Sequence, residues 1–90
     1  MLFRSPLHIA FPPPNAELEL ASIEGQSESL PVVLKAEGGK LPLTWLVDGV
    51  PLSSSPHRRD AFLMPPGPGF VQITVVDADG RSDRTQIRLR

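Results

Sequence analysis

The sequence predicts an all-β protein, an immunoglobulin-like antiparallel β-sandwich of about seven short strands, formed by a single domain over residues 1–90. Apolar residues alternate with polar ones over short segments, which is the period of a half-buried strand. Eleven prolines and seven glycines interrupt the chain, so that no long window has helical periodicity. Turn signals recur about every 8 to 12 residues, as in sandwiches.

The first third of the chain predicts three strands. Residues 7–11 form the first, and the run Pro12-Pro13-Pro14-Asn15 forms a rigid bend that suits an edge or a change of sheet. Residues 17–20 form a short second strand. A polar turn at 25–29 precedes the third strand at 30–37, and its expected inward face is Leu30, Val32, Leu34 and Ala36.

The sequence LPLTWLVDGVPL, residues 41–52, follows a turn at 38–40 and predicts a hairpin around the only tryptophan. Asp-Gly tolerates the positive φ angles that a two-residue turn requires at both central positions, here Asp48-Gly49. Leu43, Trp45 and Val47 share one face by their period-two spacing. We therefore expect Trp45 to be the central aromatic residue of the core.

A serine-rich loop at 53–57 precedes a strand at 59–64, which places Phe62 and Met64 on the same face. The segment 65–69 cannot continue this strand, because its prolines lack the N–H donor and its glycines favour positive φ.

The last quarter of the chain predicts a second hairpin, with strands at 70–76 and 84–90. The loop 77–80 between them fits a type I turn followed by a glycine bulge. The expected core face consists of Val71, Ile73, Val75, Thr85, Ile87 and Leu89.

Composition excludes several kinds of function. Without cysteine the chain forms no disulfide and no thiolate metal site. A net charge of −1, with basic residues that are not interleaved with aromatic ones, argues against nucleic-acid binding. The apolar runs are far shorter than the roughly 20 residues that cross a bilayer. We expect no cofactor and no insertion into a membrane.

Four segments carry a resemblance to a known family: IAFPPPNA at 9–16, WLVDGVPL at 45–52, GPGF at 67–70 and ITVVDADGRS at 73–82. Together they resemble the C-terminal domain of class A bifunctional penicillin-binding proteins, most closely the 1C type, over nearly the whole chain. The family commonly has Asn-Gly in place of Asp48-Gly49 and an aspartate in place of Pro66. Neither difference threatens the fold, because Asp-Gly forms the same turn and Pro66 lies in a loop.

The resemblance implies a location and a role. The parent enzymes are anchored in the cytoplasmic membrane and build peptidoglycan outside it, with a glycosyltransferase domain, a transpeptidase domain and then this accessory domain. Arg90 would then lie at or near the end of the parent protein. The association of the family with bacterial α2-macroglobulin-like proteins implies one candidate periplasmic partner.

The sequence lacks the motifs of penicillin-sensitive transpeptidation. That chemistry requires a serine with lysine three residues on, a Ser-x-Asn element and a Lys-Thr-Gly element. None of the eight serines has that lysine, and Lys35 and Lys40 are followed by Ala36 and Leu41. We therefore expect a domain that is not catalytic.

Other residue groups have both a functional and a structural interpretation, and the structural one is favoured. Ser53-Ser54-Ser55 with His57 and Asp60 contains the residue types of a catalytic triad, but a solvated loop is expected.

Asp77, Asp79 and Gly80 match only part of a calcium loop and predict a hairpin turn. The two histidines, His8 and His57, are too few for a zinc site by themselves. Trp45 could stack on a sugar, but its register favours the core.

Five arginines are the candidate partner contacts. Arg84, Arg88 and Arg90 form a basic stripe along the last strand, near a sheet edge, and Arg58 and Arg59 form a second pair. Charge at an edge blocks aggregation, and arginine also suits carboxylates of a partner.

We expect a periplasmic accessory domain that docks on its own transpeptidase domain or on a periplasmic protein. A peptidoglycan-binding module is the alternative, and an enzyme of a new type is disfavoured because no set of titratable groups converges.

Overall fold

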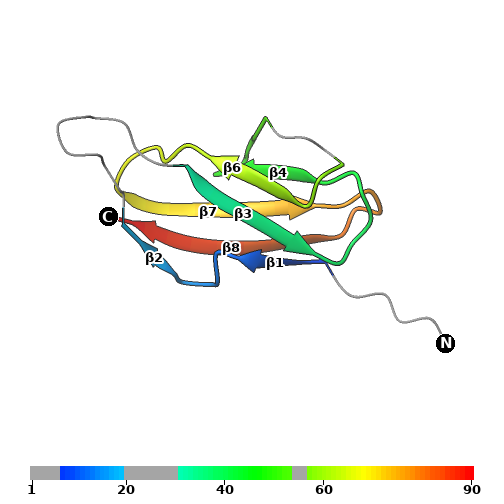
Figure 1. Ribbon diagram of the computed structural model, residues 1–90, viewed down its shortest axis with the longest axis horizontal. Coiled ribbons are helices and arrows are strands. Elements are labelled where there is room, and N and C mark those ends of the chain that lie inside the picture. The colour runs from blue at the N-terminus through cyan, green and yellow to red at the C-terminus, as the bar shows by residue number, and fades with distance from the viewer. Residues whose placement is uncertain (1–6, 20–30, 54–56) are drawn as a thin grey trace.

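The computed structural model describes residues 7–19, 31–53 and 57–90, and these residues form two β-sheets packed as a sandwich, with no helix among them (Figure 1). The first sheet has the order β1-β3-β6, with β1 at His8–Phe11, β3 at Val32–Glu37 and β6 at Asp60–Leu63. The second has the order β2-β8-β7-β4-β5, with β2 at Glu17–Leu18, β8 at Ser82–Leu89, β7 at Gly69–Val76, β4 at Thr44–Val47 and β5 at Val50–Pro51.

The all-β sandwich predicted from the sequence is confirmed. The strand order is compatible with an immunoglobulin-like arrangement, in which the chain leaves one sheet after its first strand and joins the other. The proline bend makes this change, since β1 lies in the three-stranded sheet and β2 in the five-stranded one. One pairing differs from the antiparallel sandwich that the sequence predicts, because β2 runs parallel to β8.

The core lies between the sheets and is built from alternate residues of the strands, because successive side chains of a strand point to opposite faces. Trp45 is 1% exposed and is the largest side chain in it. The buried hydrophobic residues are Leu7, Ile9, Leu34, Ala36, Leu43, Trp45, Ala61, Leu63, Val71, Ile73, Val75, Ile87 and Leu89.

The two predicted hairpins are confirmed. Asp48 and Gly49 have φ angles of 51° and 82°, as a two-residue primed turn requires, and β4 pairs with β5 across them. Leu43 and Trp45 are buried, whereas Val47 is only half-buried. In the second hairpin the amide of Gly80 donates to the carbonyl of Asp77 at 3.2 Å, and Gly80 has a φ of 82°.

Several boundaries differ from those expected. β7 begins at Gly69, one residue before the predicted start, because a glycine with a φ of 134° can still enter the strand pairing opposite Leu89. β2 ends at Leu18, two residues before the predicted end of that strand. The predicted turn at 25–29, and the residues Leu20, Leu30, Ser54 and Ser55, lie outside the described residues.

The inward face of β6 consists of one small and one aliphatic residue. Ala61 and Leu63 are buried, whereas Phe62 is 57% exposed and Met64 is 62% exposed. Both alternate sets in this strand contain apolar residues, so periodicity alone does not indicate which set faces inward. Phe62 and Met64 do share a face, as predicted, and that face is the solvent side of the three-stranded sheet.

Candidate partner-contact surfaces

The five candidate arginines lie in three separate places. Arg58 and Arg59 precede β6 in the three-stranded sheet. Arg88 lies near the end of β8 in the other sheet and Arg90 directly follows that strand, whereas Arg84 lies near the start of β8, opposite Thr74. The structure therefore does not bring all five together into one basic surface.

Arg58 forms a bidentate ion pair with Asp60 at the start of β6. Its Nε donates to Oδ1 of Asp60 at 2.8 Å and its Nη2 donates to Oδ2 at 3.0 Å. These hydrogen bonds lower the pKa of the Asp60 carboxyl below its ordinary value. The carboxylate that the sequence placed near His57 is thus held by an arginine, as a solvated structural pair.

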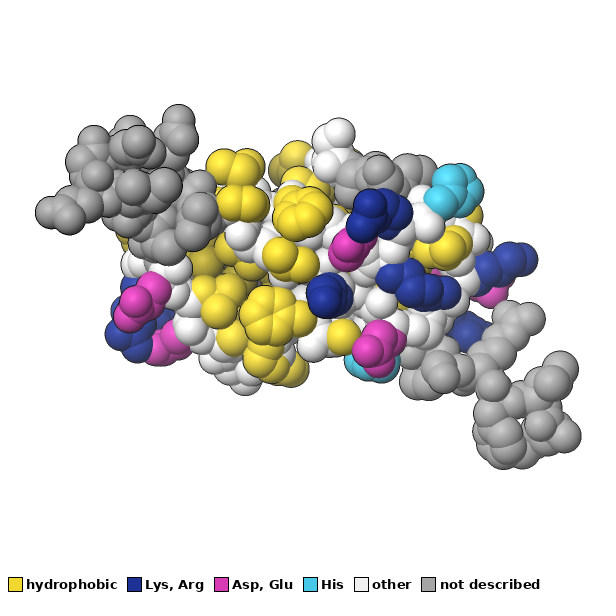
Figure 2. All heavy atoms as spheres, in the orientation of Figure 1, with side chains coloured by type: hydrophobic (Ala, Val, Ile, Leu, Met, Phe, Trp, Pro, Cys, Tyr) yellow, Lys and Arg dark blue, Asp and Glu magenta, His cyan; other side chains and the backbone are white. Residues whose placement is uncertain are grey.

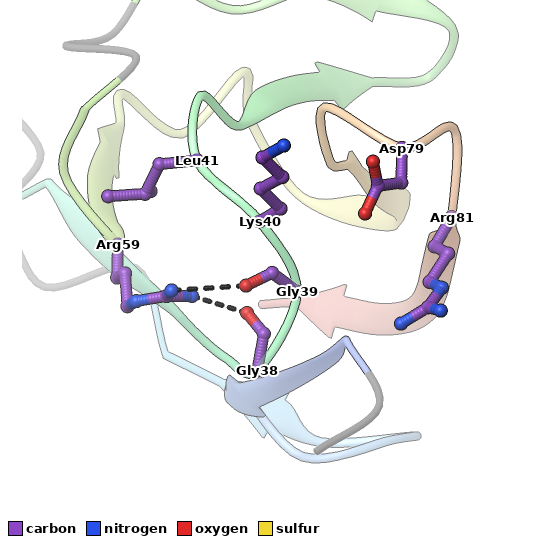
Figure 3. A pocket seen from close by; sticks show the side chains of 7 residues that line it. All are labelled: Gly38, Gly39, Lys40, Leu41, Arg59, Asp79 and Arg81. Atoms are coloured by element: carbon purple, nitrogen blue, oxygen red, sulfur yellow. Dashed lines mark hydrogen bonds between the residues drawn. The ribbon is translucent and has the colours of Figure 1, made fainter. Parts of the chain in front are cut away.

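Arg59 ties the start of β6 to the turn between β3 and β4. Its guanidinium donates to the carbonyl oxygens of Gly38 and Gly39, the second at 3.2 Å (Figure 3). These contacts lie beside a shallow cavity of about 580 Å³, which the side chains of Lys40, Asp79 and Arg81 also border. Arg59 therefore has a structural role, whatever else it contacts.

Asp77 joins two loops at the same end of the sandwich. Its side chain is nearly buried and accepts backbone N–H groups of Arg81 at 2.8 Å, Asp79 at 2.9 Å and Lys40 at 3.1 Å. Burial alone would raise the pKa of this carboxyl, but the hydrogen bonds lower it below its ordinary value. Asp77 thus serves the hairpin turn that the sequence predicts, and its oxygens are already used.

Glu17 is the common partner of two candidate arginines. Nη1 of Arg88 lies 3.7 Å from its Oε1, and Arg90 donates a hydrogen bond to its Oε2. The hydrogen bond from Arg90 lowers the pKa of Glu17. The guanidinium of Arg88 also lies 5.8 Å from the ring centre of Phe70, a cation–π contact. These pairs connect β2 to the end of β8.

Arg84 differs from the other four arginines. It is exposed on the outer face of β8, and no ion pair or hydrogen bond joins its side chain to another residue in the part of the chain that the structure describes. The contact role of all five arginines stays a prediction, but four of them already have partners within the chain.

The outer face of the three-stranded sheet carries apolar side chains for which the sequence suggested no role. Phe62 pairs directly with the half-buried Val33, Met64 follows two residues on, and Phe11 is 40% exposed on neighbouring β1. We call Phe11, Val33, Phe62 and Met64 the outer apolar face. Figure 2 shows hydrophobic side chains gathered around the centre of this side of the molecule, with charged ones over its right part and at its left end.

A second shallow hollow on the three-stranded sheet is bordered by the charged residues Lys35, Glu37, Arg58, Arg59 and Asp60. An exposed apolar group bordered by polar side chains is typical of a protein interface. The only hint of it in the sequence is the apolar run at 61–64, because apolar residues occupy both faces of a strand there.

The described residues show two further features that bear on function. No group of three or more histidine, aspartate or glutamate side chains among them is placed to hold a metal ion. The same part of the chain contains no helix long and apolar enough to cross a membrane.

The described residues thus form a small β-sandwich, in which Glu17, Asp60 and Asp77 are held by arginine or backbone N–H groups and an apolar face is exposed on one sheet. The chain belongs to the Penicillin-Binding Protein C-terminus Family, whose model matches residues 3–89. The match confirms the resemblance that the sequence motifs indicated. Comparison with curated proteins gave no match, and comparison with solved structures gave none either.

Proposed function

We propose that this chain is a non-catalytic accessory domain of a bifunctional peptidoglycan synthase, and that it acts by binding protein. Its partner is the transpeptidase domain of the same enzyme or a periplasmic protein, for which a bacterial α2-macroglobulin-like protein is one candidate. Membership of a penicillin-binding protein family supports an extracytoplasmic parent anchored in the membrane.

The outer apolar face is the observation that carries this proposal. Two of its side chains, Phe62 and Met64, are more than half exposed. Exposed apolar side chains that lie together and are bordered by charge mark protein contacts more often than isolated ones do. Sugar recognition would instead be expected to use an exposed tryptophan, and Trp45 is buried.

Photo-crosslinking tests the proposal in the full-length protein that carries the domain. A photoreactive phenylalanine at position 62 is expected to give a crosslinked protein, either within the enzyme or to a second protein. Phe70 is the matched control, since it is 67% exposed but lies on the other sheet. Equal crosslinking from positions 62 and 70, or none from 62, would overturn protein docking through the outer apolar face.

Binding to peptidoglycan is the second candidate function, and Arg84 is the observation that favours it. An exposed guanidinium without a partner in the described part of the chain is available to a carboxylate of the wall. Co-sedimentation with purified sacculi tests this function. We expect the double variant Arg84→Ala with Arg88→Ala to lose sedimentation with sacculi if the wall is the ligand, and sedimentation of this double variant at the wild-type level would exclude that role for Arg84 and Arg88.

A further inference from the structure

Three of the four edge strands, β1, β2 and β5, have features that hinder another strand from pairing with them. On β1, the outward amide of Ile9 donates to Oδ2 of Asp83 at 2.9 Å. The edge strands β2 and β5 are two residues long, and Pro51 in β5 lacks an N–H group. Short strands, proline and side chains that cover the backbone are the usual protections of an edge.

β6 is the fourth edge, and it lacks these protections. It has four residues, Asp60–Leu63, with neither proline nor lysine, and its only strand neighbour in the described part of the chain is β3. Its outer apolar residues make it the edge most suited to receive a strand.

The register of β6 shows which backbone groups point outward. The amide of Ala36 donates to the carbonyl of Arg59 at 2.8 Å, so these two residues are a hydrogen-bonded pair. In an antiparallel ladder such pairs alternate with pairs whose backbone groups point away. In this register the backbone N–H and C=O groups of Ala61 and Leu63 point toward β3. The N–H and C=O groups of Phe62 therefore face the open edge.

The side chains beside this edge are apolar at one end and charged at the other. A strand added next to β6 would place alternate side chains on the solvent side of the sheet, next to Phe62 and Met64. At the start of β6, Lys35, Arg58 and Arg59 outnumber Asp60 and Glu37, so that an acidic residue of the added strand would be complementary there.

We propose that the β6 edge binds an extended segment of a partner protein, which adds as a strand to the three-stranded sheet. The segment has two apolar residues, two positions apart, beside Phe62 and Met64, and an acidic residue beside Arg58 and Arg59. Main-chain hydrogen bonds give affinity in this mode of recognition, and alternate side chains give specificity. The inference rests on the proposed function, because it names how the docked protein is held.

The test uses random 12-residue peptides displayed on phage, selected against the 90-residue chain. We expect selected peptides to contain the alternating apolar pair and the acidic residue. N-methylation of each backbone amide of one such peptide, in turn, is expected to weaken binding at least tenfold at every second residue and little at the residues between. A strand that pairs along one side has this period, because only alternate amides face β6.

Variants of the protein give a second measurement. Phe62→Ala removes the ring but keeps the outward N–H, and we expect it to weaken peptide binding about tenfold. Phe62→Pro also removes that N–H and leaves the β3 side of the ladder intact, so its binding is expected to be lost. Melting curves of both variants show whether the fold is retained, and the N-methyl scan remains decisive if Phe62→Pro does not fold.

Three results would overturn the inference: no selected peptide binds, the N-methyl scan shows no period of two, or the chain dimerises through β6 so that a second copy occupies the edge. These results are distinct from failure of the proposed function. Suppose that position 62 crosslinks to a protein in the full-length enzyme but the N-methyl scan shows no two-residue period. Protein docking would then remain supported, and strand addition would be excluded.

Discussion

Trp45 is the single residue on which the core depends most. It has the largest side chain among the fully buried ones and lies on β4, opposite Val75 of β7. Its indole Nε1 is buried without a hydrogen-bond partner in the described part of the chain. The residue therefore contributes through packing, and its polar atom carries a desolvation cost that the packing outweighs.

Truncation of this residue is expected to be severe. Trp45→Ala should lower the free energy of unfolding by about 3 to 5 kcal/mol, because it leaves a cavity where the two sheets meet. Small domains have total stabilities of only about 5 to 15 kcal/mol, so much of the population would unfold. Urea denaturation followed by circular dichroism measures the change.

Trp45→Phe is the matched control, since it keeps an aromatic ring and removes the unpaired N–H. It should cost clearly less than Trp45→Ala. A Trp45→Ala protein that melts as the wild type does would contradict the central position of this side chain.

At the scale of elements, two glycine-containing turns have different requirements. Gly49 in the β4–β5 turn has a φ of 82°, and a Cβ there would meet no atom within 4 Å. Gly39, in the turn after β3, has a φ of 71°, and a Cβ would lie 2.8 Å from Cδ1 of Leu7 and 3.0 Å from Oδ2 of Asp77. The first turn needs glycine for its backbone angle, and the second also needs it for space.

Alanine substitutions separate these two requirements. Gly49→Ala should cost about 1 to 2 kcal/mol, the price of a left-handed conformation for a residue with a side chain. Gly39→Ala should cost about 1 to 3 kcal/mol more, because Leu7 and Asp77 must move. Thermal melts of both variants beside the wild type measure the difference. Equal destabilisation would show that Leu7 and Asp77 move aside without lowering the free energy of unfolding.

The sequence predicts these turns because their signals are local. Asp48-Gly49 and the loop at 77–80 lie between alternating strands, and both hairpins form where expected. The hydrogen bond from the amide of Lys40 to Asp77 could not be predicted in this way, because it joins residues 37 positions apart. The outer apolar face depends likewise on which side of β6 packs against the other sheet.

At the scale of the whole molecule, three carboxylates link the fold to pH. Hydrogen bonds from Arg90 and Arg58 lower the pKa values of Glu17 and Asp60. For Asp77, burial opposes ionisation, but backbone N–H groups prevail and its pKa is also lowered. Glu17 is exposed, whereas Asp77 is nearly buried and less screened by solvent.

The direction of the pH effect follows from these lowered values. A carboxyl group whose pKa is lower in the folded state binds fewer protons there than in the unfolded chain, where its pKa is about 4. Its contribution to stability is therefore present above about pH 5 and is lost as the pH falls through the unfolded and then the folded value. The domain should melt at a nearly constant temperature from pH 7 to about 5 and at progressively lower temperatures below that.

Asp77→Asn should reduce this acid dependence most, because an amide cannot replace a carboxylate that accepts three N–H groups. The variant should be less stable than the wild type at pH 7, and the two melting temperatures should converge near pH 3. Glu17→Gln is the control, since its ion pairs are exposed, and it should leave the pH profile nearly unchanged in 0.5 M salt, roughly the range where surface charges are screened. A profile that flattens in Glu17→Gln and stays steep in Asp77→Asn would place the acid sensitivity at the Glu17–Arg90 pair instead of in the buried turn.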